Sequence, residues 1–154
     1  MTDFDRLTTD SWTIAFPCDW EDQSDGETTY FESPDGSKGF YVSLWNMGEA
    51  EERTASQLID VFIATELDGL LGGSDQRELL SKGIKQIGNL VVCNWDTLAQ
   101  ANCYRVAGKI LARGKQVLRA TFHDYDCEDY VASLEHFSHI IGSLELRDGL
   151  VGQT

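Results

Sequence analysis

Four basic side chains in the second half of the chain could bind an anion: Arg105, Lys109, Arg119 and His123. They fall on two segments, 103–112 and 116–126, which we predict to be strands joined by a three-residue hairpin loop. If Ala112 pairs with Gln116, all four side chains share one sheet face, and Lys109 lies directly opposite Arg119. Like charges in that position destabilise a sheet, so a carboxylate or phosphate ligand, an acidic partner segment or the chain's own acidic residues must compensate. An anion-binding sheet face is our alternative hypothesis for function.

A second group of residues could support covalent chemistry. Cys127 follows His123 by four residues, at a predicted boundary between a strand and a helix. A thiolate at a helix N-terminus is activated, and a neighbouring imidazole could serve as its base. Such a pair also needs contact at about 3 Å and an oxyanion donor, and the sequence indicates neither. A structural cysteine is the favoured interpretation, and we predict no catalytic residue.

The candidate metal ligands form no complete set. His136 and His139 are three apart on a predicted helix and could share a metal, but no further ligands can be assigned to them. The segment Glu21–Glu32 loosely copies a calcium-binding loop, yet it begins with Glu and has no flanking helices. A half-buried helix face and an acidic surface turn are the favoured interpretations. We therefore predict no metal and no cofactor.

The four cysteines are expected to be reduced thiols: Cys18, Cys93, Cys103 and Cys127. They form no C-x-x-C pair, and no histidine lies at zinc-ligand spacing from two of them. One disulfide between Cys93 and Cys103 on paired strands stays open as an alternative, although cytoplasmic proteins seldom keep one.

Nearly all of the net negative charge lies in the first half of the chain. The first 77 residues hold 17 acidic and four basic residues, the rest hold nine and eight, and the net charge is −14. Such a potential repels nucleic acid and anionic lipid and attracts a basic protein partner. The residues expected to form this partner-binding acidic surface are Asp19, Glu21, Asp22, Asp25, Glu27, Glu49, Glu51 and Glu52.

Composition is typical of one soluble domain. Of the 154 residues, 42% are hydrophobic and 25% are charged. We predict a single domain over 1–154, with a core of about 11–146 and a flexible tail at 147–154. No apolar run approaches the ~18 residues of a membrane span. The acidic N-terminus lacks the apolar region of a secretory signal, so we expect a cytoplasmic protein without membrane contact.

Hydrophobic periodicity predicts the elements that carry these residues. The predicted strands are 12–17, 28–33, 39–47, 78–86, 90–98, 103–112 and 116–126. Apolar residues at i, i+3, i+4 and i+7 predict a helix over 55–71, with Thr54 and Gln57 as its capping box and Gly72 at its end. This order predicts an α+β fold, in which an antiparallel sheet of about six strands carries two main helices.

The last predicted helix begins at an N-cap formed by Asp126. Its expected apolar stripe is Tyr130, Val131, Leu134, Phe137, Ile141 and Leu144. The helix should pack that stripe on the sheet.

Two local motifs frame the predicted domain. Trp12-x-Ile14-x-Phe16-Pro17-x-x-Trp20 begins it, and Phe137, Ile141, Ser143 and Leu144 end it. Together with the order of elements, they resemble the PsbP/DcrB-like α/β/α sandwich superfamily over roughly residues 11–146. The superfamily includes photosystem accessory subunits, a Ran-binding nuclear-transport factor and bacterial chaperones or adaptors for secreted effectors. The resemblance implies protein binding, and it assigns no binding residue to this chain.

The function predicted from these features is a non-catalytic protein-binding module. It would act as a bacterial effector chaperone, an adaptor or an immunity protein whose acidic surface binds a basic partner. The sequence has no G-x-S-x-G, P-loop, G-x-G-x-x-G or H-E-x-x-H motif, so we predict that it is not an enzyme. An acidic surface would speed association with a basic partner at low salt.

Overall fold

The computed structural model of the chain describes residues 3–26 and 28–147. The strands are β1 (Phe4–Thr8), β2 (Trp12–Pro17), β3 (Glu21–Asp22), β4 (Thr29–Glu32), β5 (Lys38–Asn46), β6 (Glu78–Ile87), β7 (Leu90–Ala99), β8 (Tyr104–Arg113), β9 (Gln116–Asp124) and β10 (Glu145–Leu146). The helices are α1 (Ala55–Leu71) and α2 (Tyr130–Ile140), with short 3-10 turns η1 (Gln100–Asn102) and η2 (Ile141–Ser143). Of the expected flexible tail at 147–154, residues 148–154 lie outside the described residues, and Arg147 is described.

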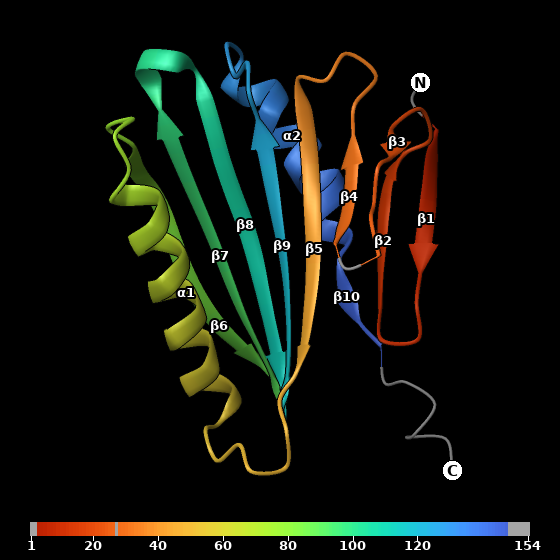
Figure 1. The fold of residues 1–154 in the computed structure, drawn as a ribbon, viewed down its shortest axis with the longest axis vertical. Coiled ribbons are helices and arrows are strands. Elements are labelled where there is room, and N and C mark those ends of the chain that lie inside the picture. The colour runs from red at the N-terminus through yellow and green to blue at the C-terminus, as the bar shows by residue number, and fades with distance from the viewer. Residues whose placement is uncertain (1–2, 27, 148–154) are drawn as a thin grey trace.

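A seven-stranded antiparallel sheet forms the centre of the molecule, in the order β3-β4-β5-β9-β8-β7-β6. A three-stranded sheet, in the order β1-β2-β10, accompanies it. Helix α1 packs on one face of the large sheet, and α2 and the small sheet lie on the other face (Figure 1). The α+β prediction is confirmed, but the large sheet exceeds the expected six strands. The sequence did not predict β1, β3 and β10.

Two hydrophobic cores fill the space on either side of the large sheet. Trp12, Ile14 and Phe16 of β2 pack with Phe40 and Phe122 in the core beneath α2. On the α1 side, the core includes Leu58, Ile59 and Ile63 of the helix together with Trp95 and Ile110 of the sheet. Strand β5 contributes to both cores, because its successive side chains point to opposite faces.

Strands β6 to β9 form a meander whose last hairpin differs from the predicted one by one residue. Arg113 pairs with Gln116, so the loop has two residues, and Gly114 adopts a positive φ of 60°. Glycine at the first position of a two-residue loop is typical of a type II′ turn. The predicted pairing of Ala112 with Gln116 is therefore wrong. A shift of one residue moves every side chain of one strand to the other face of the sheet.

Helix α1 has the boundaries and the cap that the sequence predicted. The Thr54 hydroxyl accepts from the Gln57 backbone N–H at 3.2 Å, and the Gln57 side chain accepts from the Thr54 N–H at 2.8 Å. Gly72 ends the helix, and its N–H donates to the Asp68 carbonyl. The apolar stripe is buried on β7 and β8, so burial rather than propensity holds the helix in place.

Helix α2 begins three residues later than predicted. Its N-cap is Asp129, whose carboxylate accepts from the Ala132 N–H at 3.1 Å, so the predicted cap at Asp126 is wrong. The predicted stripe is also partly wrong, because Val131 is 68% exposed and Leu134 is 40% exposed. The side of α2 that faces the core carries Ser133, Phe137 and Ile140.

The described residues contain no helix that is long and apolar enough to cross a membrane. All four cysteines are free, with Cys93 and Cys127 buried. The alternative of a disulfide between Cys93 and Cys103 is therefore not found in the structure.

Candidate functional site

The hairpin register separates the four basic residues that the sequence placed on one face. Arg119 pairs with Ile110 and His123 pairs with Val106, so these two side chains lie on the α1 face. Lys109 pairs with Ala120 and Arg105 pairs with Asp124, so these two lie on the α2 face. The predicted basic face with Lys109 opposite Arg119 is wrong, because the loop is one residue shorter than assumed.

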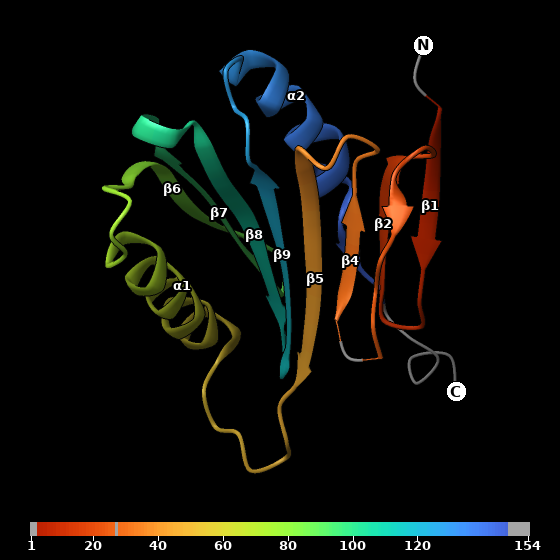
Figure 2. The ribbon, with the colours of Figure 1, turned by 45° about the horizontal axis from the view of Figure 1, so that its top comes forward.

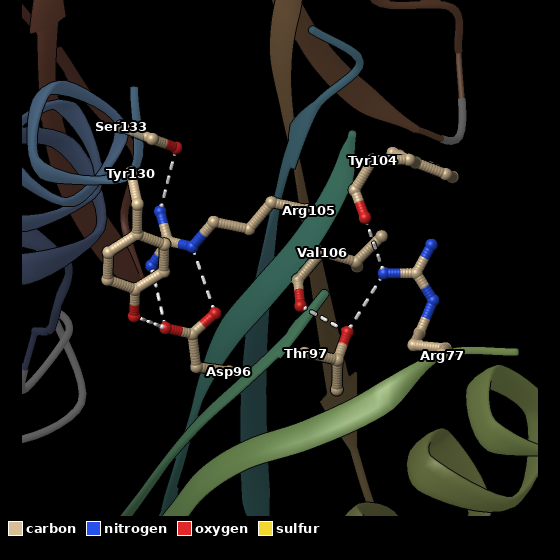
Figure 3. Close-up of polar contacts among 8 residues, drawn as sticks. All are labelled: Arg77, Asp96, Thr97, Tyr104, Arg105, Val106, Tyr130 and Ser133. Carbon is tan, nitrogen blue, oxygen red and sulfur yellow. Dashed lines mark hydrogen bonds and ion pairs between the residues drawn. The ribbon is translucent and has the colours of Figure 1, made fainter. Parts of the chain in front are cut away.

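Arg105 holds α2 to the sheet rather than facing solvent (Figure 3). Its guanidinium is fully buried and donates to both Asp96 oxygens, at 2.9 and 3.1 Å, and to Ser133 Oγ of α2 at 3.0 Å. The Tyr130 hydroxyl of α2 also donates to Asp96. Bidentate pairing of this kind fixes geometry strongly. One of the chain's own acidic residues, Asp96, thus compensates the charge of Arg105, and this guanidinium is not available to an anionic ligand.

A second buried arginine organises the α1 face. Arg77 Nη1 donates to Thr97 Oγ1 at 3.1 Å and to the Tyr104 carbonyl at 2.9 Å (Figure 3). Its Nη2 pairs with Asp75 at 2.8 Å. The guanidinium carbon also lies 4.6 Å from the centre of the Tyr104 ring. Arg77 therefore fixes the start of β6 and the position of Tyr104, and no sequence motif indicated this role.

Tyr104 belongs to a group of aromatic side chains that the helix α1 leaves uncovered. We call this group the tyrosine face, and its members are Tyr30, Tyr41, Tyr104, His123 and Tyr125. Helix α1 contacts β7, β8 and β9, and its Phe62 packs on Trp45 near the end of β5. In Figure 1, no helix or strand lies in front of the upper ends of β5 and β9. Figure 2 shows the same arrangement from a tilted view. The tyrosine face thus occupies the open part of the α1 side.

Ring contacts make the tyrosine face continuous across four strands. Tyr30 and Tyr41 stack at 4.4 Å between ring centres, and the edge of Tyr41 meets His123 at 5.4 Å. Tyr125 stacks on Tyr104 at 5.0 Å and on His123 at 5.7 Å. The Tyr104 hydroxyl and His123 Nδ1 lie 2.7 Å apart. Rings fixed by such contacts lose little freedom on binding a partner.

A cavity of about 350 Å³ adjoins the tyrosine face. Tyr41, Ser43, Thr121 and His123 line its sheet side, and Glu66 of α1 lies across from them. Arg119 also lines it, but its guanidinium pairs with Glu66 at 3.1 Å and lies 5.3 Å from the Trp45 ring. Its charge is therefore already balanced within the chain.

Electrostatics keep the tyrosine face neutral at physiological pH. Burial, with the charges of Arg77 and Arg119, lowers the pKa of His123 to about 4. Burial and the neighbouring tyrosines raise the pKa of Tyr125 to about 12. The rings therefore act as uncharged hydrogen-bonding and π surfaces. Tyrosines of this kind are enriched at protein interfaces because they combine apolar area with a polar tip.

Two glutamates border the tyrosine face at its β3–β4 edge. Glu21 pairs with Glu32 across this short ladder, so both carboxylates lie on the same side as Tyr30. The Tyr30 hydroxyl donates to Glu32 at 2.5 Å. Neither glutamate forms an ion pair within residues 3–26 and 28–147. Two carboxylates in directly opposed positions repel each other, and a cation placed between them would relieve that repulsion.

The predicted acidic residues fall into two groups. Asp19, Glu21, Asp22 and Asp25 are exposed on and around β3, which lies toward the upper end in Figure 1. Glu49 and Glu52 are exposed in the loop between β5 and α1, at the lower end. Glu51, in the same loop, pairs with Arg53 at 2.7 Å. Glu27 lies outside the described residues.

The other sequence candidates are not assembled into reactive sites. Burial raises the pKa of the Cys127 thiol, with Ser133 as its hydrogen-bond partner, while His123 is bonded to Tyr104. His139 packs against Phe4 and His136 against Trp20. The described part of the chain holds no group of three His, Cys, Asp or Glu side chains that could bind a metal.

Comparison with solved structures finds the same arrangement of layers elsewhere. No protein-family model matches this chain, and no curated protein is detectably similar in sequence. The solution structure of cyanobacterial PsbP (CyanoP) from Synechocystis sp. PCC 6803 matches with a TM-score of 0.66 and 13% identity, over 96% of this chain and 94% of that chain. A crystal structure from Bacteroides thetaiotaomicron VPI-5482 matches with a TM-score of 0.58 and 18% identity, over 96% of this chain and 50% of that chain.

The chain is thus an α+β sandwich in which two helices cover opposite faces of an antiparallel sheet. Within that class its fold is PsbP-like, which confirms the resemblance seen in the sequence. At these identities the likeness concerns the fold alone, so the site must be interpreted from its own residues.

Proposed function

We propose that this chain is a non-catalytic protein-binding module that holds a basic segment of its partner on the tyrosine face. The observation that carries the proposal is the opposed pair Glu21 and Glu32 at the border of the stacked rings. A lysine or arginine from a partner would lie between the two carboxylates. A neighbouring cation would lie over the ring of Tyr30 or Tyr41, where such contacts contribute about 0.5–2 kcal/mol.

The charge of the whole chain supports the same kind of partner. The net charge of −14 attracts basic proteins over a distance and raises the association rate at low ionic strength. The tyrosine face would then supply the short-range contacts, since aromatic side chains dominate binding energy at interfaces. Roles as an effector chaperone, an adaptor or an immunity protein all fit such a module.

A panel of short peptides tests the proposal directly. The peptides would combine Lys or Arg with aliphatic residues, and each would have a matched version with Glu in place of every cation. Amide NMR shifts should map basic peptides to Tyr41, Thr121, His123 and Tyr125, and binding should weaken as salt rises. The acidic versions should not bind.

Two charge-matched variants separate local recognition from the effect of net charge. Glu21→Lys with Glu32→Lys should weaken basic peptides at least about tenfold, because it replaces the opposed pair by cations. Glu49→Lys with Glu52→Lys changes the net charge equally at the distant loop and should weaken them much less. Equal losses in both variants, or shifts centred on the loop between β5 and α1, would refute a site on the tyrosine face.

A further inference from the structure

The α2 face of the sheet contains a second cavity, of about 520 Å³, which we call the lysine trough. Strands β6, β7 and β8 form its floor, and the segment from Gly142 to Leu146 forms its wall. The volume is in the range of small-molecule sites. The tyrosine face lies on the opposite side of the sheet, so the two sites are separate.

The trough exists because α2 covers only part of its face of the sheet. The helix ends at Ile140, η2 follows, and the chain then runs away to pair β10 with β2. On the α2 face, the lower ends of β6, β7 and β8 therefore lie beside this wall with no helix over them (Figure 1). An open floor between a sheet and a returning segment is a suitable place for a ligand.

Apolar side chains make up most of the lining. Val92 and Leu111 belong to the buried core and form the floor, while Leu144 belongs to the same core and forms part of the wall. Leu90 is half-buried, and Ile87 is 56% exposed at the mouth. Val92, Leu111 and Leu144 are at most 4% exposed, so the apolar surface that still faces water belongs mainly to Ile87 and Leu90. An alkyl chain that covers this surface would be favoured by roughly 25 cal/mol per Å².

Two ammonium groups approach the apolar floor from neighbouring strands. Lys85 pairs with Val92, and Lys109 pairs with Asn94, so both side chains lie on the trough side of the sheet. Lys109 is half-buried, and its Nζ donates to the Leu144 carbonyl at 3.2 Å. Burial lowers the pKa of Lys109; the charge of Glu145 opposes this effect, and the charge of Lys85 adds to it. The two lysines form no ion pair with any carboxylate of the described residues.

The charges of the lining indicate the kind of head group that fits. Lys85 and Lys109 supply two positive charges, and Glu145 at the wall supplies one negative charge. The excess of one positive charge matches a ligand with one negative charge. Asn94 is exposed on β7, the strand between those of Lys85 and Lys109, and its amide can donate a further hydrogen bond.

We propose that the lysine trough binds a small amphipathic carboxylate, with its alkyl chain against Ile87 and Leu90 above the floor and its head group between Lys85 and Lys109. The alkyl chain would displace water from Ile87 and Leu90, and the carboxylate would accept from both ammonium groups. This site is independent of the protein-binding role proposed above.

Decanoate is the probe, with butanoate and decanamide as controls for the alkyl chain and the charge. Amide NMR titration of the full chain should give saturable shifts at Val92, Asn94, Leu111 and Leu144 for decanoate below its micellar concentration. Butanoate and decanamide should bind much more weakly, because each lacks one half of the interaction. Equal binding of decanamide, or no saturable shift with decanoate, would overturn the proposal.

Neighbouring lysines on β6 provide a matched pair of variants. Lys85→Gln should weaken the binding of decanoate about three- to fivefold. Lys82 pairs with Trp95, so its side chain lies on the α1 face, and Lys82→Gln should leave decanoate binding unchanged. Lys109→Gln should weaken decanoate binding about tenfold. If Lys109→Gln proves unstable, the comparison of Lys85→Gln with Lys82→Gln still tests the site. Equal effects of Lys82→Gln and Lys85→Gln would show simple charge attraction and would overturn the site.

Vesicles of anionic phospholipid distinguish a free acid from a membrane surface. The chain should not sediment with them, because its net charge of −14 opposes such contact. Binding to vesicles that depends on Lys85, without binding of free decanoate, would refute the assignment to a small carboxylate.

Discussion

Protonation of His123 should destabilise the fold in a narrow range of mildly acidic pH. The ring has a pKa of about 4 in the folded chain, against an ordinary value of 6.5. Between these values the unfolded chain binds more protons than the folded chain, so the free energy of unfolding falls as the pH falls. The stabilising contribution of the neutral ring is complete above pH 6.5 and is lost as the pH approaches 4.

The magnitude follows from the difference between the two pKa values. Going from about pH 7.5 to about pH 4.5 should remove about 2.5 kcal/mol if the whole shift is realised. The ring is half-buried, so solvent screening reduces this figure. We therefore expect a loss of at least about 1 kcal/mol that is specific to His123.

Urea unfolding followed by tryptophan fluorescence would measure this loss across the pH range. The matched variant is His123→Gln, which removes the titrating ring and keeps an acceptor for the Tyr104 hydroxyl. The carboxylates and the other two histidines are common to both proteins, so their contributions cancel in the difference. Parallel stability curves for the two proteins, or an NMR pKa near 6.5 for His123, would refute the account of a buried neutral ring.

Three further predictions concern stability. Asp96→Asn should cost about 3–5 kcal/mol, because it leaves the buried Arg105 charge without its partner; the double variant Asp96→Leu with Arg105→Met should recover most of this in urea unfolding. Gly108→Ala should cost about 1–3 kcal/mol, because the new Cβ would lie 2.5 Å from the Trp95 ring, whereas Gly83→Ala on β6 meets nothing within 4 Å and should be close to neutral by thermal melting. Thr54→Ala should cost about 0.5–2 kcal/mol by removing half of the capping box, and a smaller change in chemical denaturation would contradict the role of that cap.

Local patterns in the sequence were enough to predict the elements but not their exact pairing. The capping box of Thr54 and Gln57 and the stripe of α1 are short-range signals, and both are confirmed. The β8–β9 register depends on whether the loop has two or three residues, and Arg113-Gly114-Lys115 suits either length. That single ambiguity led to the wrong prediction that Arg105 and Lys109 share a face with Arg119 and His123.

The cap of α2 shows a similar limit. Asp126 and Asp129 are both good cap residues, and the choice depends on how far the chain must travel after β9 before it can pack.

The tyrosine face was beyond sequence reasoning for a different reason. Tyr41 and His123 meet because β5 pairs with β9, and nothing local specifies which distant strands become neighbours.

The pairing of β5 with β9 also governs how the chain can assemble during synthesis. Asn46 and Gln116 are adjacent in the sheet but 70 positions apart in the chain. A ribosome therefore releases the first half long before the strand that completes it exists, and β5 waits with one edge unpaired. The hairpins of β6 to β9 join residues that are close in sequence and can form quickly. Until those hairpins form, the unpaired edge of β5 is the part of the nascent chain most open to aggregation.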